Sequence, residues 1–420
     1  MNVQEKTAVA AVDATRLSPF VALKHRDFVL LLGGRWISTV GSQMMTVGVA
    51  YHVYHLNEST WELGLLGLFR LVPVLALSLV GGGLADSVDR RRVMLAAQPV
   101  LLLCSVALAF STLAGFASLP VIYTAVAVAA AAGAIYGPAQ QAIVPALVPR
   151  EHLPNALSWS ITTMEVATIV GPALGGIAIA VIGLAGVYAV DAVSFLAVIV
   201  ALLLMRVRLG AATVGSGRGW RAATEGLRFI RGNRIVFAVM SLDFLAMFWG
   251  SATVLLPALA DKVLHVGTTE LGFLFAAPAA GAVVGAVAMT AFGNRIRKPG
   301  WPLLLSVAAY GATTVGVGLS TAVPLALLFL AGTGAADTVS MTLRHQILQL
   351  LTPNEVRGRV TAANQVFVQG GPQLGSLEAG AVAAVFGVAF SIASGGGACV
   401  VGVLLVALLV PSIRRYRNAV

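Results

Sequence analysis

The feature that most constrains this chain is a series of long apolar segments separated by short polar ones. Only 10% of the 420 residues are charged, whereas a soluble globular domain carries about a quarter. The composition therefore excludes a soluble enzyme and a disordered chain. The 45 glycines follow no Gly-X-Y period, which excludes collagen as well. A polytopic membrane protein remains.

A helix needs about 20 mostly apolar residues to cross a bilayer. Applied along the chain, this length predicts an all-α protein with twelve transmembrane helices in two pseudo-symmetric six-helix bundles. The predicted spans are 29–51, 63–84, 93–115, 121–144, 157–181, 185–205, 235–257, 271–292, 301–319, 324–345, 361–385 and 388–411.

The basic residues orient these spans. If the N-terminus is cytoplasmic, 24 of the 27 Lys and Arg residues fall in cytoplasmic segments, and the outer loops hold only Lys262. This is a strong positive-inside pattern. It predicts a multi-pass protein of the bacterial plasma (inner) membrane with both termini in the cytoplasm. The net charge of +10 then reflects topology, and we expect no nucleic-acid partner.

The two halves of the chain repeat short motifs in the same order. Glu62-Leu63-Gly64 recurs as Glu270-Leu271-Gly272, and Gly171-Pro172-Ala173-Leu174-Gly175 recurs as Gly371-Pro372-Gln373-Leu374-Gly375. Repeated six-span halves are a transporter architecture with the site between them. The polar segment 206–234 between the halves is predicted to be either an amphipathic interfacial helix or a solvated linker. The predicted division is an N-terminal segment 1–28, a bundle 29–205, a linker 206–234, a bundle 235–411 and a tail 412–420.

Several motifs point to one family. The segment Gly82-Gly83-Leu84-Ala85-Asp86-Ser87-Val88-Asp89-Arg90-Arg91-Arg92 resembles the signature loop of the major facilitator superfamily. The segments 337–340, 352–360 and 378–380 are similar to the branch that contains the enterobactin exporter and macrolide efflux proteins. The resemblance implies export of a small molecule by alternating access. One departure is that span four carries no charge, so any proton coupling must use groups other than the arginine usual there.

The same resemblance implies a conformational latch and a hinge. In the loop between spans two and three, Asp86 is expected to cap the N-terminus of helix eleven, where backbone N–H groups favour an anion. The motif beginning at Gly171 is either a functional hinge or a close-packing contact. The predicted latch residues are Gly82, Asp86, Asp89, Arg90 and Arg91, and the predicted hinge residues are Gly171, Pro172 and Gly175.

Ionisable residues inside a membrane are costly and are functional candidates by default. We expect Asp243 and Asp337 to be midplane carboxyls that exchange protons, with Glu165 as the third choice. Neither aspartate has a basic residue within one turn of its own helix, and Arg35 or Arg70 is expected to approach the coupling carboxyl in one state only. Arg344 is seven residues from Asp337 and is predicted to be too far away to pair with it. Asp191 is expected near a helix end. The predicted substrate and proton pathway comprises Arg35, Arg70, Tyr136, Gln140, Glu165, Asp243, Asp337 and Glu378.

These features predict a proton-coupled exporter of a small amphipathic molecule such as a siderophore or a drug. An uptake permease is the alternative within transport, and a membrane-embedded receptor or enzyme is the alternative of another class. The sequence contains no Gly-x-x-x-x-Gly-Lys-Ser/Thr and no His-Glu-x-x-His motif. We therefore expect no catalytic residues, no metal and no cofactor. The expected partners are a small-molecule substrate, protons and membrane lipids, and the expected oligomeric state is a monomer.

Overall fold

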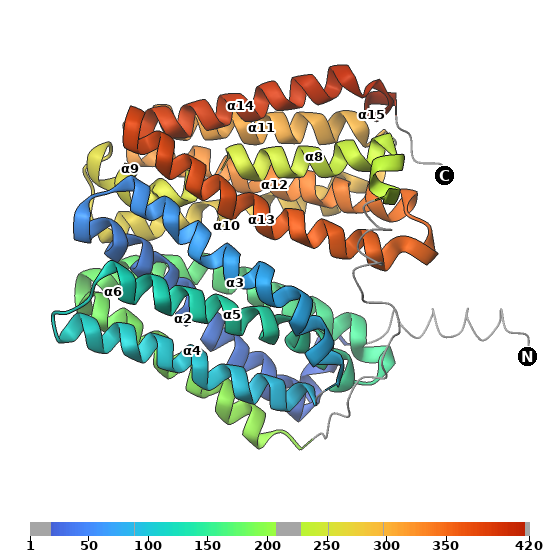
Figure 1. Cartoon of the computed structure of the whole chain (residues 1–420). Coiled ribbons are helices and arrows are strands. Elements are labelled where there is room, and N and C mark those ends of the chain that lie inside the picture. Colours follow the sequence, from blue (N-terminus) through green and yellow to red (C-terminus); the bar gives the residue numbers. More distant parts are fainter. Residues whose placement is uncertain (1–17, 88, 207–227, 251, 297, 416–420) are drawn as a thin grey trace, which may run out of the picture.

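The computed structural model describes residues 18–87, 89–206, 228–250, 252–296 and 298–415, and within these ranges the chain is helical with short loops and has no strand (Figure 1). The long helices are α2 (Arg26–Asn57), α3 (Thr60–Ser87), α4 (Arg90–Leu113), α5 (Leu119–Ile143), α6 (Leu153–Leu204), α8 (Arg234–Trp249), α10 (Thr268–Phe292), α11 (Gly300–Leu319), α12 (Val323–Leu351), α13 (Asn354–Phe386) and α14 (Val388–Leu409). The short ones are α9 (Leu256–Lys262), α15 (Pro411–Arg415) and the 3-10 helices η1 (Val21–Lys24), η2 (Val144–Ala146), η3 (Arg150–His152), η4 (Ala252–Leu255) and η5 (Gly293–Arg295).

These helices correspond to the twelve predicted spans, with two differences in detail. The fifth and sixth spans run on as α6, whose backbone leaves helical geometry only at Gly183 (φ 72°, ψ 176°). The positive φ of Gly183 is one that glycine alone adopts without steric cost. The seventh span, predicted as one continuous segment, is broken into α8, η4 and α9. The equivalent turn of the second half, between α13 and α14, uses Gly387 at φ 90° and ψ 161°.

Nine helical stretches among the described residues are long and apolar enough to cross a membrane on composition alone. That number counts α6 once and omits α2 and α13. Both omitted helices are interrupted by polar side chains, Arg35 and a run of Ser and Thr in α2 and the glutamines of α13. The same side chains line the central cavity described below, which explains why these two helices are less apolar than the rest.

The long helices pack into two bundles with corresponding contacts. In the first bundle α3 packs on α5, and α4 packs on α5 and α6; in the second, α10 packs on α12, and α11 packs on α12 and α14. Two helix pairs join the bundles, α3 with α13 and α6 with α10. In Figure 1 the first bundle occupies the lower part of the view and the second the upper part. The helix pairs that pack together in the first bundle therefore have counterparts in the second, as the sequence repeat predicts.

The buried cores show where the bundles meet. One core cluster contains residues of both bundles, among them Val53 of α2, Leu259 of α9 and Ala383 of α13. This shared core lies at the end of the molecule opposite α15, called here the distal end; the end near α15 is called the terminal end (Figure 1). At the terminal end the cores are separate, since each remaining cluster draws on one bundle alone. The bundles are therefore closed against each other at the distal end.

Two glycine contacts make this closure possible. In the pair α3–α13, a Cβ on Gly64 would lie 3.1 Å from the Cα of Gly380. In the pair α6–α10, a Cβ on Gly176 would meet the Cα of Gly272 at 2.6 Å. Small residues allow membrane helices to approach this closely. We call these two contacts the glycine crossings.

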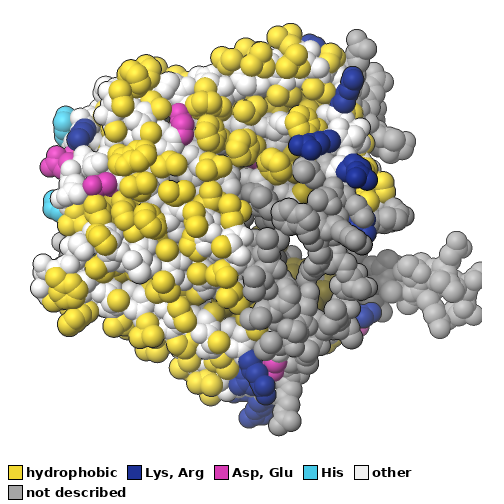
Figure 2. All heavy atoms as spheres, viewed as in Figure 1, with side chains coloured by type: hydrophobic (Ala, Val, Ile, Leu, Met, Phe, Trp, Pro, Cys, Tyr) yellow, Lys and Arg dark blue, Asp and Glu magenta, His cyan; other side chains and the backbone are white. Residues whose placement is uncertain are grey.

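The surface fits a protein that spans a membrane. Figure 2 shows hydrophobic side chains over much of the described part of one face, with Lys and Arg mainly at the terminal end, and with His and charged side chains of both signs at the distal end. The predicted amphipathic segment 206–234 lies largely outside the described residues, and only 228–232 of it is seen as helix before α8.

The glycine crossings generate a stability prediction. Gly176→Val introduces atoms where the backbone of α10 already lies, and overpacking of this kind costs about 1–3 kcal/mol. We expect the apparent melting temperature of the purified protein to fall by several degrees. Gly397→Val is the matched control, because nothing lies within 4 Å of a Cβ at that position of α14. Equal melting temperatures for the two variants would contradict the crossing.

Candidate functional site

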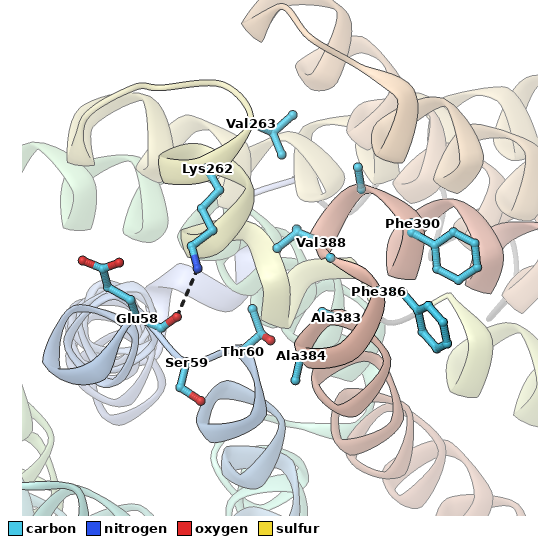
Figure 3. A pocket seen from close by; sticks show the side chains of 12 residues that line it. Glu58, Ser59, Thr60, Lys262, Val263, Ala383, Ala384, Phe386, Val388 and Phe390 are labelled. Atoms are coloured by element: carbon cyan, nitrogen blue, oxygen red, sulfur yellow. Dashed lines mark hydrogen bonds between the residues drawn. The ribbon is translucent and has the colours of Figure 1, made fainter.

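The distal closure is completed by polar contacts between the bundles. The hydroxyl of Tyr54 in α2 donates a hydrogen bond of 2.8 Å to the Oδ2 of Asp261 in α9. The ammonium of Lys262 donates to the backbone carbonyl of Glu58 at 3.3 Å and lies 5.8 Å from the centre of the Tyr54 ring. Figure 3 shows Lys262 reaching from α9 toward Glu58 across a pocket of about 420 Å³. Its far wall is apolar and includes Phe386 and Phe390.

A larger cavity of about 570 Å³ lies inward of this closure. It is lined by α2, α3, α4, α5 and α6 of the first bundle and by two glutamines of α13 from the second. Four of the predicted pathway residues line it together: Arg35, Arg70, Tyr136 and Gln140. Its other polar lining residues are Ser38, Thr39, Ser42, Gln43, Thr46, Gln98, Ser105, Gln369 and Gln373.

Part of the cavity wall is a small hydrogen-bonded group on α5. The side-chain amide of Gln140 donates to the hydroxyl of Tyr136 at 2.8 Å, one helical turn away. Arg35, on the facing side of α2, keeps its Nε buried and without a hydrogen-bond partner. The group therefore presents neutral donors and acceptors next to a guanidinium, and its function stays a prediction.

The remaining predicted carboxyls are arranged differently from expectation. Asp243 and Asp337 do not line this cavity; they meet at Arg344 in the second bundle. The guanidinium of Arg344 forms a salt bridge with Asp243 and lies 3.7 Å from the Oδ1 of Asp337. Asp243 and Arg344 are buried, and Asp337 is partly exposed.

This cluster, the Asp243–Arg344–Asp337 triad, corrects two predictions. The aspartates were expected to be unpaired, and Arg344 was expected to be too far from Asp337 to pair with it. The spacing was predicted correctly, since residues 337 and 344 lie two turns apart on one face of α12, and the error concerned the reach of the arginine side chain. The long side chain of Arg344 spans that interval and also reaches α8.

Asp191 is a buried carboxyl that the sequence analysis placed near a helix end. It is 0% exposed in the middle of the second part of α6. Its oxygens accept hydrogen bonds from the hydroxyl of Ser42 at 3.2 Å and from that of Ser105 at 2.6 Å. Asp191 thus ties α2, α4 and α6 together behind the cavity wall, and the expected position near a helix end is wrong.

Glu165 and Glu378 are not brought into the cavity. Glu165 is exposed on α6, next to the lining residue Met164, and Glu378 is half-buried on α13. Neither is among the residues that line the central cavity.

The predicted latch is seen only in part. For Gly82 and Asp86 the structure describes only the helical backbone of α3, so the proposed cap on helix eleven stays a prediction. Asp89 caps α4 by accepting a hydrogen bond from the backbone N–H of Arg91 at 2.9 Å. The guanidinium of Arg91 donates to the carbonyl of Leu203 near the end of α6 at 3.2 Å. Arg90 begins α4 directly after this cap. Asp89 and Arg91 therefore hold elements of one bundle together.

The predicted hinge residues Gly171, Pro172 and Gly175 are buried in a stretch of α6 that keeps helical geometry. A Cβ on Gly171 would meet the side chain of Gln43 and the carbonyl of Val40, and one on Gly175 would lie 2.9 Å from the Cα of Met44. The motif packs α6 tightly on α2, as expected for a close-packing contact. Its role as a hinge stays a prediction.

Comparison with known proteins decides the family. The profile of a family described as transmembrane secretion effectors matches residues 17–417. The chain belongs to this family. It is 29% identical over 398 residues to the enterobactin exporter EntS of Shigella boydii serotype 18, with 94% of each chain covered, and 29% identical to that of Escherichia coli O1:K1.

Solved structures support the fold. A bacterial homologue of the iron transporter ferroportin superposes with a TM-score of 0.72 at 16% identity, covering 93% of this chain and 99% of that one. A bacterial homologue of the lysosomal transporter Spinster gives 0.68 at 16% identity, covering 93% and 96%. The resemblance to the major facilitator superfamily is confirmed, and the protein is a secondary transporter that exports small molecules.

Three groups of functional interest were missed from sequence. Arg344 carried a usable signal, since it shares a helix face with Asp337. Asp191 and its two serines are brought together by contacts between helices that no spacing along one helix reveals, and Gln98 of α4 lines the same cavity as Gln369 and Gln373 of α13.

The distal closure yields a second prediction. Tyr54→Phe removes the hydrogen bond to Asp261 and leaves the ring in place. A hydrogen bond to a charged group contributes about 1.5–3 kcal/mol, and the exposure of Asp261 reduces this toward about 1 kcal/mol. We expect the population opened at the distal end to rise several-fold.

The measurement is a spin-label distance between positions 56 and 265 in the purified protein, in a background in which Cys104 and Cys399 are replaced by serine. Tyr51→Phe is the control, because Tyr51 lies one turn away on α2 and stacks on His55. A distance distribution unchanged by Tyr54→Phe would show that the bond does not hold the closure.

Proposed function

We propose that this protein is a proton-coupled exporter that moves a small amphipathic molecule, such as a siderophore or a drug, by alternating access. The cavity between the bundles, closed at the distal end by the glycine crossings and the Tyr54–Asp261 bond, supports a state that faces the terminal end. The names of the curated relatives, which are enterobactin exporters, support a siderophore-like substrate. The role is transport and not catalysis.

The observation that carries proton coupling is the Asp243–Arg344–Asp337 triad. Two carboxyls share one guanidinium, so the group has one net negative charge when both carboxyls are ionised. One bound proton makes the group neutral. Burial in a low-dielectric interior favours neutral groups over charged ones. The triad therefore supports the uptake of a single proton in each cycle.

The triad also has the geometry of a switch. Asp243 lies on α8 and Asp337 on α12, so the protonation of either carboxyl changes how strongly Arg344 ties these helices together. Asp337 is the more exposed carboxyl and is the one we expect to exchange the proton. A proton that binds more tightly in one conformation than in the other shifts the population between them.

The test is transport in proteoliposomes. Proton release driven by substrate is first screened across catecholate siderophores, macrolides and lipophilic cations to find a transported compound. Asp243→Asn and Asp337→Asn are then expected to abolish accumulation driven by a pH gradient while leaving exchange of the compound down its own gradient. Loss of both activities would report a folding defect, so the charge-balanced double variant Asp243→Asn/Arg344→Gln is measured beside them.

Glu165→Gln is the matched control, since it makes the same chemical change at an exposed carboxyl outside the triad. We expect it to keep coupled export. If both aspartate variants retain full export driven by the pH gradient, the assignment is wrong and Glu165 becomes the leading candidate.

We further propose that both termini and the linker 206–234 are cytoplasmic, that the chain is divided as 29–205 and 235–411, and that it acts as a monomer in the bacterial inner membrane. The basic asymmetry of the sequence supports this orientation. In intact cells, a cysteine at position 118 should react with an impermeant maleimide, and one at position 216 should react only after the membrane is permeabilised. Labelling of position 216 from outside would overturn the proposed topology.

A further inference from the structure

The central cavity has an unbalanced charge. Two of its lining residues, Arg35 on α2 and Arg70 on α3, are basic, and none of the described residues that line it is acidic. The remaining polar groups on its wall are hydroxyls and amides, which are neutral.

Neither arginine has an acidic partner among the residues that the structure describes. In the described part of the chain, the salt bridges involve Arg26 and Arg344 and not Arg35 or Arg70. The Nε of Arg35 is buried without a hydrogen-bond partner, and its polar neighbour Tyr136 is bonded to Gln140. The guanidinium groups of Arg35 and Arg70 therefore keep N–H donors that no described residue accepts from.

Three buried or partly buried carboxyls of the two bundles, Asp191, Asp243 and Asp337, have partners other than Arg35 and Arg70. Asp191 lies behind the wall and accepts hydrogen bonds from Ser42 and Ser105, and it does not line the cavity. Asp243 and Asp337 are held by Arg344 in the second bundle.

An arginine without a counter-charge is tolerable only while water fills the cavity. Alternating access requires an intermediate in which the cavity is sealed at both ends. Sealing removes most of the water, and enclosing an uncompensated charge in a membrane protein is costly. A bound anion removes that cost, because two guanidinium groups present planar donor sets that match carboxylate or phenolate oxygens. The cavity therefore closes most readily around a negatively charged molecule.

We infer that the transported substrates are organic anions, whose acidic oxygens bind Arg35 and Arg70. This inference rests on the proposed export function and specifies its substrate class. Gln98, Gln369 and Gln373 supply hydrogen bonds to the polar groups of the same molecule, and Val74, Leu101 and Phe195 contact its apolar part. A volume of about 570 Å³ is in the range of small-molecule binding sites.

The test compares two dyes that share a xanthene scaffold and differ in charge, the anion 5-carboxyfluorescein and the cation rhodamine 123. Equilibrium binding to the purified full-length protein is measured by fluorescence anisotropy without a proton gradient. We expect the anion to bind at least tenfold more tightly than the cation. Arg35→Gln and Arg70→Gln should each weaken binding of the anion by tenfold or more.

Arg35→Lys and Arg70→Lys test whether charge is responsible. Each should recover part of the affinity, which a purely structural role of the guanidinium does not predict. Arg150→Gln is the matched control, since it removes the same charge from the exposed 3-10 helix η3, and it should bind both dyes as the unmodified protein does.

Equal binding of the two dyes, binding of neither, or full affinity in both glutamine variants would overturn the inference. These outcomes are distinct from failure of the proposed function. The binding assay needs no gradient, and loss of coupling in the triad variants leaves the dye affinities unchanged.

Discussion

The arrangement of this protein depends on the cost of placing ionised groups inside a membrane. A charged side chain there must be paired, solvated by protein dipoles or exposed to water. The structure uses all three solutions. Arg344 is paired with two carboxyls, Asp191 is solvated by serine hydroxyls, and Arg35 and Arg70 face a cavity. The first two solutions fix where neighbouring helices sit, because Asp243 and Arg344, and Asp191 and its serines, come from different helices.

The two bundles share their helix packing and differ in their chemistry. Corresponding helices make corresponding contacts, and the turns at Gly183 and Gly387 have similar backbone angles. Yet the basic cavity is built almost entirely from the first bundle, and the acidic triad belongs to the second. The proposed functions divide accordingly, with substrate bound mainly by one bundle and the proton by the other. Coupling then requires that the contacts between the bundles, α3 with α13 and α6 with α10, link substrate binding in the first bundle to protonation in the second.

The sequence predicted the helices well because span length and hydropathy are properties of single segments. It predicted the basic and neutral part of the cavity, Arg35 with Tyr136 and Gln140, because polar residues on otherwise apolar spans are conspicuous. It did not predict the partners of the carboxyls. Asp243 meets Arg344 across two helices, and Asp191 meets Ser105 across 86 positions of sequence. Such pairings depend on how helices are placed side by side, which periodicity along one helix does not encode. The break between α8 and α9 was missed for a related reason, since the Gly250 carbonyl is satisfied by the hydroxyl of Tyr310 on another helix.

The glycine crossings have a mechanical consequence. Two points of close backbone contact, one near Gly64 and Gly380 and the other near Gly176 and Gly272, define a line through the molecule. If both contacts persist, the only rigid-body motion left to the bundles is rotation about that line. The absence of side chains at these four positions thus leaves the two bundles one hinge-like degree of freedom while the distal end is closed, and exposing the site at that end requires both contacts to separate.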